Sequence, residues 1–291
     1  MLACPQCKAV LSETTDGFCC DFCRQQYPVN QRGQLDLRLR EPQRRCISVT
    51  IGDSKDLSAD IQLQRLVRHP RPAVDFSGLP VPPHLDVEIL SHFPRATTTK
   101  SIALDLGCGS EVHREVLEHC GFAYCGIDYR SPGSTILADA HAIPLADSSV
   151  ELVLCLAVLE HVRYPLVVSA EISRVMRTGG KLIGTVAFLE PYHDLSFYHP
   201  THLGVADLLS QAGLTVTHLA PSKGWSIFTA AASMALFPKF PKKLSKALMF
   251  PTHFLHRLCW KHQYRRTAAY RWSETYRVLS TTAAFTFIAS K

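Results

Sequence analysis

A short apolar run that ends in a glycine turn constrains the fold more than any other part of this sequence. The stretch Ser101–Gly109 reads S-I-A-L-D-L-G-C-G. The apolar run predicts a buried strand, and the two glycines let backbone N–H groups approach a ligand because no Cβ stands in the way. Glu111–Cys120 then has the apolar spacing of a helix. Strand, glycine turn and helix begin a nucleotide-binding βαβ unit, with the ligand at the C-terminal edge of the strand.

The glycine turn lacks a feature that dinucleotide-binding turns need. Their fingerprint has a third glycine where this chain has Val112. Asp105 instead places a carboxylate two residues before the first glycine. A carboxylate there suits a cationic or zwitterionic ligand better than a phosphate.

An acidic residue also follows the second predicted strand. Phe122–Ile127 is apolar and ends in Asp128, 19 residues after Gly109. A carboxylate at the end of the second strand of a βαβ unit can accept hydrogen bonds from both hydroxyls of a ribose.

Several weaker motifs follow in order over Ser101–Ala187. They are the acidic turn Ile136–Ala140, the strand Val150–Leu156, the sequence L-E-H-V at Leu159–Val162, and the helix, glycine turn and strand of Ile172–Leu182. Together with Asp105-x-Gly107-x-Gly109, this order resembles the class I S-adenosylmethionine-dependent methyltransferases, in particular their type-11 group. Two departures are Glu111, where the family often has a third glycine, and Val150-Glu151 in place of the usual Phe-Asp.

The resemblance implies a fold and a set of cofactor contacts. The fold class is α/β, a doubly wound Rossmann-like sheet whose antiparallel last strand would be Phe285–Ala289. The resemblance implies that Asp139, followed by a small residue, reads the adenine amino group, and that the glycine turn holds the amino-acid end of the cofactor. The candidate S-adenosylmethionine-binding residues are Asp105, Gly107, Cys108, Gly109, Asp128, Asp139, Ala140 and Leu156.

A histidine-rich loop follows the fifth predicted strand and should overhang the methyl donor. It contains His193, His199 and His202. A histidine with a pKa near neutrality can take a proton from an attacking hydroxyl or amine. His193 and His199 are the candidate general bases, and substrate packing or helix capping is the alternative role.

The N-terminus carries a predicted zinc site. Cys4-x-x-Cys7 and Cys20-x-x-Cys23 are two knuckles with 12 residues between them. Two knuckles supply the four thiolates of a structural zinc centre. Cys19 could replace Cys20, but the C-x-x-C symmetry favours Cys20. About 35 residues bury too little core to fold alone, so the metal would supply folding energy.

The predicted domains are a zinc ribbon at 1–40, a linker at 41–83 with a short helix at Leu57–Val67, and a methyltransferase domain at 84–291. The ribbon is expected to close with strands at Tyr27–Val29 and Leu35–Leu37. Residues 225–279 form an insertion between the last two strands. Within it, Pro238–Arg277 has ten Lys/Arg and one acidic residue, a local charge of +9 that leaves −3 for the rest of a chain of net charge +6. This basic segment, interleaved with aromatic residues, suits RNA or a membrane surface, or it is a helical cap with a solvated face.

The sequence therefore predicts methyl transfer to an oxygen or nitrogen acceptor, a small molecule or a glycan. Ribosomal or other RNA is the alternative acceptor, and a non-catalytic scaffold that kept the fold is a third possibility. No basic leader precedes an apolar run at the N-terminus, and the longest apolar stretch, Trp225–Phe237, has 13 residues, fewer than the ~20 of a spanning helix. A cytoplasmic protein is expected.

Overall fold

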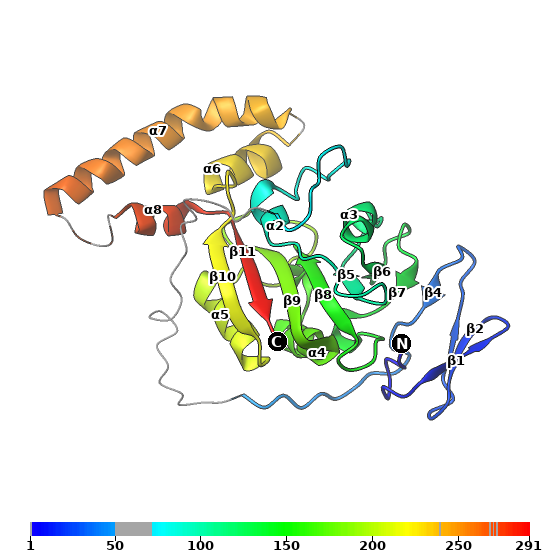
Figure 1. The fold of residues 1–291 in the computed structure, drawn as a ribbon. Helices are drawn as coiled ribbons and strands as arrows, with labels where there is room; N and C mark the ends of the chain where they lie inside the picture. Colours follow the sequence, from blue (N-terminus) through cyan, green and yellow to red (C-terminus); the bar gives the residue numbers. More distant parts are fainter. Residues whose placement is uncertain (1, 50–71, 239, 268, 270, 272) are drawn as a thin grey trace.

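The computed structural model describes residues 2–49, 72–238, 240–267, 269, 271 and 273–291, so the helix expected at Leu57–Val67 lies outside the described residues. A large mixed sheet forms the centre of the molecule (Figure 1). Its strands are β4 (Leu35–Asp36), β5 (Ile102–Leu106), β6 (Ala123–Asp128), β7 (Ile136–Leu137), β8 (Val150–Leu156), β9 (Met176–Ala187), β10 (Thr215–Pro221) and β11 (Ala284–Ser290). Their order is β10-β11-β9-β8-β5-β6-β7-β4.

The direction of the strands confirms the predicted fold class. β11 runs antiparallel to both of its neighbours, β9 and β10. The other neighbouring pairs are parallel. The strand order reverses between β5 and β8, which is the point where open α/β sheets bind their ligands.

Helices cover both faces of the sheet. They are α2 (Val87–Ser91), α3 (Arg114–His119), α4 (Pro165–Val175) and α5 (His202–Gln211), with 3₁₀ turns η1 (Ala140–Ala142) and η2 (Leu159–His161). Alternate side chains of β8 divide between the two faces: Val153 and Cys155 pack in the core with α4 and α5, whereas Leu152 and Leu154 pack with α2 and α3. A strand buried on both faces has a nearly continuous apolar sequence, which explains the run at Val150–Leu156.

The helix after the glycine turn begins later than the sequence predicts. Glu111 has a left-handed φ of 59°, which a helix cannot contain, and α3 starts only at Arg114. Helical spacing would put Val112 on one side with Val116 and Leu117, but Val112 is 49% exposed whereas Val116 and Leu117 are buried. The predicted start at Glu111 is therefore wrong by three residues.

The N-terminal segment forms a small sheet that packs on the large one. β1 (Leu11–Thr14), β2 (Gly17–Cys20) and β3 (Gln26–Pro28) are antiparallel neighbours. Leu35–Asp36 was expected to close this ribbon, but as β4 it pairs in parallel with β7 and forms the edge of the large sheet. A bridge from Leu35 to Val29 still joins it to the ribbon. Ribbon and main domain therefore share a continuous core.

Helices fill the chain between β10 and β11, where an insertion was predicted. They are α6 (Ile227–Ala230), the π-helical turn η3 (Ala231–Leu236), α7 (Lys242–Thr267) and α8 (Glu274–Thr281). Figure 1 shows α7 extending away from the sheet above α6. Among the described helices, none combines the length and the apolar character that crossing a bilayer requires.

Candidate active site

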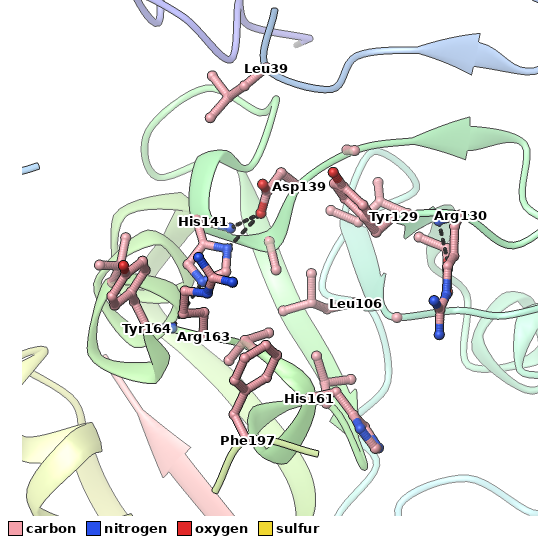
Figure 2. A pocket seen from close by; sticks show the side chains of 18 of the residues that line it. Leu39, Leu106, Tyr129, Arg130, Asp139, His141, His161, Arg163, Tyr164 and Phe197 are labelled. Carbon is pink, nitrogen blue, oxygen red and sulfur yellow. Dashed lines mark hydrogen bonds and ion pairs between the residues drawn. The ribbon is translucent and has the colours of Figure 1, made fainter. Parts of the chain in front are cut away.

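A cavity of about 1150 Å³ opens at the C-terminal ends of β5, β6 and β8. Four of the predicted cofactor residues line it, namely Gly107, Asp128, Asp139 and Ala140. The other predicted cofactor residues, Asp105, Cys108, Gly109 and Leu156, are not among its lining residues. Figure 2 shows Asp139 near one end of the cavity and His161 and Phe197 near the other, with Leu106 between them.

Asp128 connects the second strand to the glycine turn. One of its carboxylate oxygens accepts hydrogen bonds from the backbone N–H groups of Arg130 at 2.9 Å and Ser131 at 2.8 Å. The other oxygen accepts one from Gly109 N at 3.1 Å. The carboxylate is thus held at the cavity wall with lone pairs still available to a ligand.

Asp139 forms a fixed pair with His141. Its Oδ1 accepts hydrogen bonds from the backbone N–H of His141 at 2.9 Å and from His141 Nδ1 at 2.6 Å. The imidazole Nε2 in turn accepts a hydrogen bond from Tyr164 N at 3.2 Å, so the proton lies on Nδ1. Burial raises the pKa of Asp139, but the two bonds from His141 outweigh it and the pKa lies below its usual range. Asp139 is therefore an ionised acceptor, with Oδ2 free of the pair.

Asp105 supports the glycine turn from inside. It is 1% exposed, and its carboxylate lies 3.0 Å from His113 Nδ1 and accepts a hydrogen bond of 2.9 Å from the Tyr124 hydroxyl. The structure therefore turns this carboxylate into the core and away from the cavity.

Glu111 stands where the family often has a third glycine, and its side chain forms hydrogen bonds that stabilise the turn. Its Oε1 accepts a hydrogen bond from Thr135 N at 2.7 Å, and its Oε2 accepts from the Arg114 guanidinium at 3.1 Å. Burial raises the pKa of Glu111, but the hydrogen bonds from Thr135 and Arg114 lower it by more, so the pKa lies below its usual value. These contacts offset the cost of a left-handed non-glycine residue, which is about 1–2 kcal/mol.

The histidine-rich loop approaches the opposite end of the cavity. Asp194, Leu195 and Phe197 of this loop line the cavity, whereas His193 and His199 do not. The loop is held by Phe197 N, which donates a 2.7 Å hydrogen bond to Glu160 O. His161 lines the cavity between the loop and η2, and its ring centroid lies 5.2 Å from that of His193. His161 belongs to the L-E-H-V motif at Leu159–Val162, but nothing in that sequence pattern indicates a role for it.

The chain between the ribbon and the main domain forms another wall. Leu39, Gln43, Arg45 and Ile47 line the cavity, although the segment was expected to be only a linker. No sequence pattern marks these residues, because their position depends on where β4 joins the large sheet.

The four predicted metal-binding cysteines converge. One sulfur atom from each of Cys4, Cys7, Cys20 and Cys23 lies within 4.8 Å of the others. The residue after each knuckle, Lys8 or Arg24, has a positive φ, and its N–H donates to the carbonyl of the first cysteine of that knuckle. Cys19 turns its sulfur toward the carbonyl groups of Cys20 and Arg24 instead. The tetrathiolate cluster fits a zinc ion, and Cys20 is the member that joins it.

The strand order and the glycine turn are those expected of a class I S-adenosylmethionine-dependent methyltransferase domain. Residues 104–184 match the family described as methyltransferase domain. An uncharacterized methyltransferase of Mycobacterium ulcerans (strain Agy99) is 30% identical over 150 residues, which cover 46% of this chain and 58% of the relative. One from Mycobacterium bovis (strain BCG / Pasteur 1173P2) is 26% identical over 167 residues, 47% of this chain and 65% of the relative. The chain thus spans less than two thirds of the length of these relatives.

Solved structures that resemble this chain in part have low sequence identity. A chain of the Haloferax volcanii complex that contains the Trm112 methyltransferase activator is 15% identical, with a TM-score of 0.47, 71% of this chain and 88% of that chain covered. A methyltransferase of Archaeoglobus fulgidus is 14% identical, with a TM-score of 0.44 and coverages of 66% and 86%.

The two glycines of the turn should respond differently to alanine. Both glycines are left-handed, with φ of 71° at Gly107 and 56° at Gly109. A Cβ added to Gly107 would lie 2.6 Å from Val158 Cγ2, whereas a Cβ added to Gly109 would meet no atom within 4 Å. Gly109→Ala should cost only the left-handed backbone term of about 1–2 kcal/mol, and Gly107→Ala should add an overpacking cost of about 1–3 kcal/mol. Urea unfolding of the two variants measures the difference, and equal destabilisation would contradict it.

Proposed function

We propose that this protein transfers a methyl group from S-adenosylmethionine to an oxygen or nitrogen atom of a small molecule or a glycan. The observation that carries the proposal is the convergence of Gly107, Asp128 and Asp139 on one cavity at the strand-order reversal. These are the groups that the family resemblance assigns to the amino-acid end, the ribose and the adenine of the cofactor.

Each of these residues has a defined task in the proposed reaction. Asp128 would accept hydrogen bonds from the ribose hydroxyls, and Asp139 would accept one from the adenine amino group through Oδ2. The cofactor supplies an activated methyl on a sulfonium, so the protein mainly aligns the acceptor with that methyl and excludes water. The wall at Leu39 and Ile47 and the loop at Phe197 would exclude water from the two ends.

His193 and His199 stay the candidate proton acceptors from the sequence, and His161 joins them because it reaches the cavity. Burial, and then the neighbouring His193, lowers the pKa of His161. A neutral imidazole at the cavity wall can accept a proton from a bound hydroxyl or amine.

Calorimetric titration of S-adenosylmethionine into the zinc-loaded protein tests the proposal. We expect one site per chain and a dissociation constant in the micromolar range, followed by transfer of labelled methyl to candidate acceptors. A folded protein that binds no S-adenosylmethionine would support the scaffold alternative. If the protein binds labelled RNA with an affinity that falls steeply with salt, and labelled methyl appears on that RNA, the acceptor is RNA and not a small molecule or glycan.

We also propose that the four-cysteine cluster holds a structural zinc ion. Cys4 and Cys20 are fully buried, and the Tyr27 hydroxyl lies 3.2 Å from the sulfur of Cys4. A closed set of four thiolates leaves no open position for catalysis. The ion would stabilise the ribbon and, through it, the cavity wall at 39–47.

Helix α7 carries a further proposal, a contact with an anionic membrane surface. Its leucines Leu244, Leu248, Leu255 and Leu258 recur at helical spacing and are 47–60% exposed. The opposite side of the helix packs on α6, where His253 stacks on Phe228 at 5.1 Å between ring centroids. α7 has no acidic residue. An exposed aliphatic stripe beside basic residues suits the interface of an anionic bilayer, into which the exposed Phe250 and Phe254 can also insert.

Vesicle co-sedimentation tests the contact of α7 with membranes. We expect binding to phosphatidylserine vesicles and little binding to phosphatidylcholine vesicles. Leu248→Ser with Leu255→Ser should weaken it about tenfold or more, since burying one leucine contributes about 1.5–3 kcal/mol. Leu203→Ser on α5, which changes an exposed leucine far from α7 (Figure 1), is the control. Equal binding of the double variant would contradict the proposal.

A further inference from the structure

Three side chains that could ligate a metal ion meet beside the cavity, apart from the cysteine cluster. One donor atom from each of Glu160, His161 and His193 lies within 4.8 Å of the others. Donors bound 2.0–2.2 Å from a common ion lie at most about 4.4 Å apart. Shifts of a few tenths of an ångström would therefore bring the three atoms to the spacing that an ion requires.

Glu160 is a buried carboxyl with an unfilled position. It is 1% exposed, its Oε1 accepts a 2.9 Å hydrogen bond from Ala187 N, and its Oε2 has no hydrogen-bond partner. In the described part of the chain, no Lys or Arg forms an ion pair with it. A buried polar atom without a partner is costly. This oxygen therefore indicates a bound ligand that the protein itself does not supply.

The two histidines are oriented as metal ligands usually are. Nδ1 of His193 lies 2.9 Å from Pro191 O, and since a carbonyl only accepts, the proton is on Nδ1 and the Nε2 lone pair is free. A hydrogen bond from the second ring nitrogen to a backbone carbonyl is typical of metal-binding histidines. Nε2 faces Glu190 Oε2 at 3.6 Å, beyond hydrogen-bond distance, so the Nε2 lone pair of the neutral imidazole is available to a cation. Nδ1 of His161 is buried without a hydrogen-bond partner.

We propose that Glu160, His161 and His193 bind a divalent transition-metal ion that ligates a hydroxyl group of the methyl acceptor. Two imidazoles and one carboxylate with open positions suit Zn²⁺ or Fe²⁺. Because His161 also lines the cavity, the open positions are available to a molecule bound there. This proposal rests on the proposed function, and it narrows the acceptor to an alcohol or phenol. It assigns His161 and His193 to the metal in place of proton transfer.

The ion would act by making the acceptor oxygen more nucleophilic. A hydroxyl on a divalent ion loses its proton more readily than a free one. The proton leaves to solvent, the oxygen forms a bond to the methyl carbon as the carbon–sulfur bond breaks, and the sulfur keeps the electron pair. The products are the methyl ether and the neutral thioether S-adenosylhomocysteine.

Cobalt binding to the full-length, zinc-loaded protein tests the site. We expect one further equivalent of Co²⁺ per chain, with the weak visible bands of nitrogen and oxygen ligands and without the thiolate charge-transfer band of the cysteine cluster. His193→Ala and Glu160→Gln should each weaken it by at least roughly 10–100-fold, the loss seen when even the partners of metal ligands are removed. His202→Gln, which changes the histidine at the start of α5 outside the triad, should leave the cobalt affinity unchanged.

The readouts separate this proposal from the proposed function. His193 lies in a partly exposed loop, so its replacement should leave the circular dichroism spectrum and S-adenosylmethionine affinity unchanged, even if Glu160→Gln fails to fold. A wild-type protein that binds no further cobalt, or a folded His193→Ala variant that binds it as tightly, would overturn the metal site. Cobalt binding without S-adenosylmethionine binding would overturn the proposed function and leave the metal site in place.

Discussion

Asp128→Ala should abolish measurable binding of S-adenosylmethionine. The carboxylate faces the cavity and also accepts hydrogen bonds from Gly109 N, Arg130 N and Ser131 N. Its removal takes away the proposed ribose acceptor and at the same time leaves these donors without a partner. A charged hydrogen bond contributes about 1.5–3 kcal/mol, and two of them lost to the ribose correspond to a drop in affinity of at least about 100-fold.

Isothermal titration calorimetry measures this loss, with two variants as comparison. Asp128→Asn keeps the size and one acceptor oxygen, so its affinity should lie between those of wild type and Asp128→Ala. Asp207→Asn removes an exposed carboxylate on α5, away from the cavity, and should bind as wild type does. An Asp128→Ala protein that stays folded and binds within threefold of wild type would show that the cofactor does not use this residue.

The sequence predicts the sheet well because its strands are marked by local patterns. Val150–Leu156 has the predicted bounds, since burial on both faces favours a nearly continuous apolar run. Asp128 ends β6 and Asp139 comes two residues after β7, and the parallel direction of the two strands brings both carboxylates to one edge. Their place at the cavity therefore follows from strand ends and sheet direction alone.

The conformation at Glu111 could not be predicted from local sequence. A glutamate at that position is a good helix former, and helical spacing continues through Val112. The left-handed turn is stabilised by Thr135, which is 24 residues away in the sequence. A contact of such long range has no signature in the pattern around Glu111.

The same limit applies to β4 and to the Glu160 cluster. Leu35–Asp36 has only two residues in strand conformation, too few to indicate whether it pairs with the ribbon or with β7. Glu160 and His193 are 33 positions apart and meet only because the loop after β9 returns over η2, where Phe197 N bonds Glu160 O. The residue type of His193 marks it as a candidate, but its neighbours in space have no signature in the sequence around it.

Loss of zinc from the ribbon should weaken the cofactor site as well as the ribbon. In zinc-finger peptides the ion supplies about 10–16 kcal/mol of apparent binding free energy that is also folding free energy. Cys20→Ser should therefore remove the ion and unfold β1–β3. Lys8 Nζ, which bonds Glu171 at 2.7 Å, and the bridge from Leu2 to Leu145 would be lost from the contact with the main domain.

The consequence for the cavity follows from how the chain continues after the ribbon. β4 leads directly to Leu39, Gln43, Arg45 and Ile47, which form one wall. If the ribbon no longer anchors this segment, the wall loses its position, and S-adenosylmethionine affinity should fall tenfold or more while the large sheet remains folded.

Metal analysis, limited proteolysis and cofactor titration of Cys20→Ser measure these effects together. Cys19→Ser is the matched control, because its sulfur points to the carbonyl groups of Cys20 and Arg24 at 3.7 Å and is not a member of the four-cysteine cluster. It should keep the zinc and the affinity. A Cys20→Ser protein with a proteolysed ribbon and undiminished affinity would show that the wall at 39–47 holds its position without zinc, and that the ribbon serves some contact other than the one with the methyl donor.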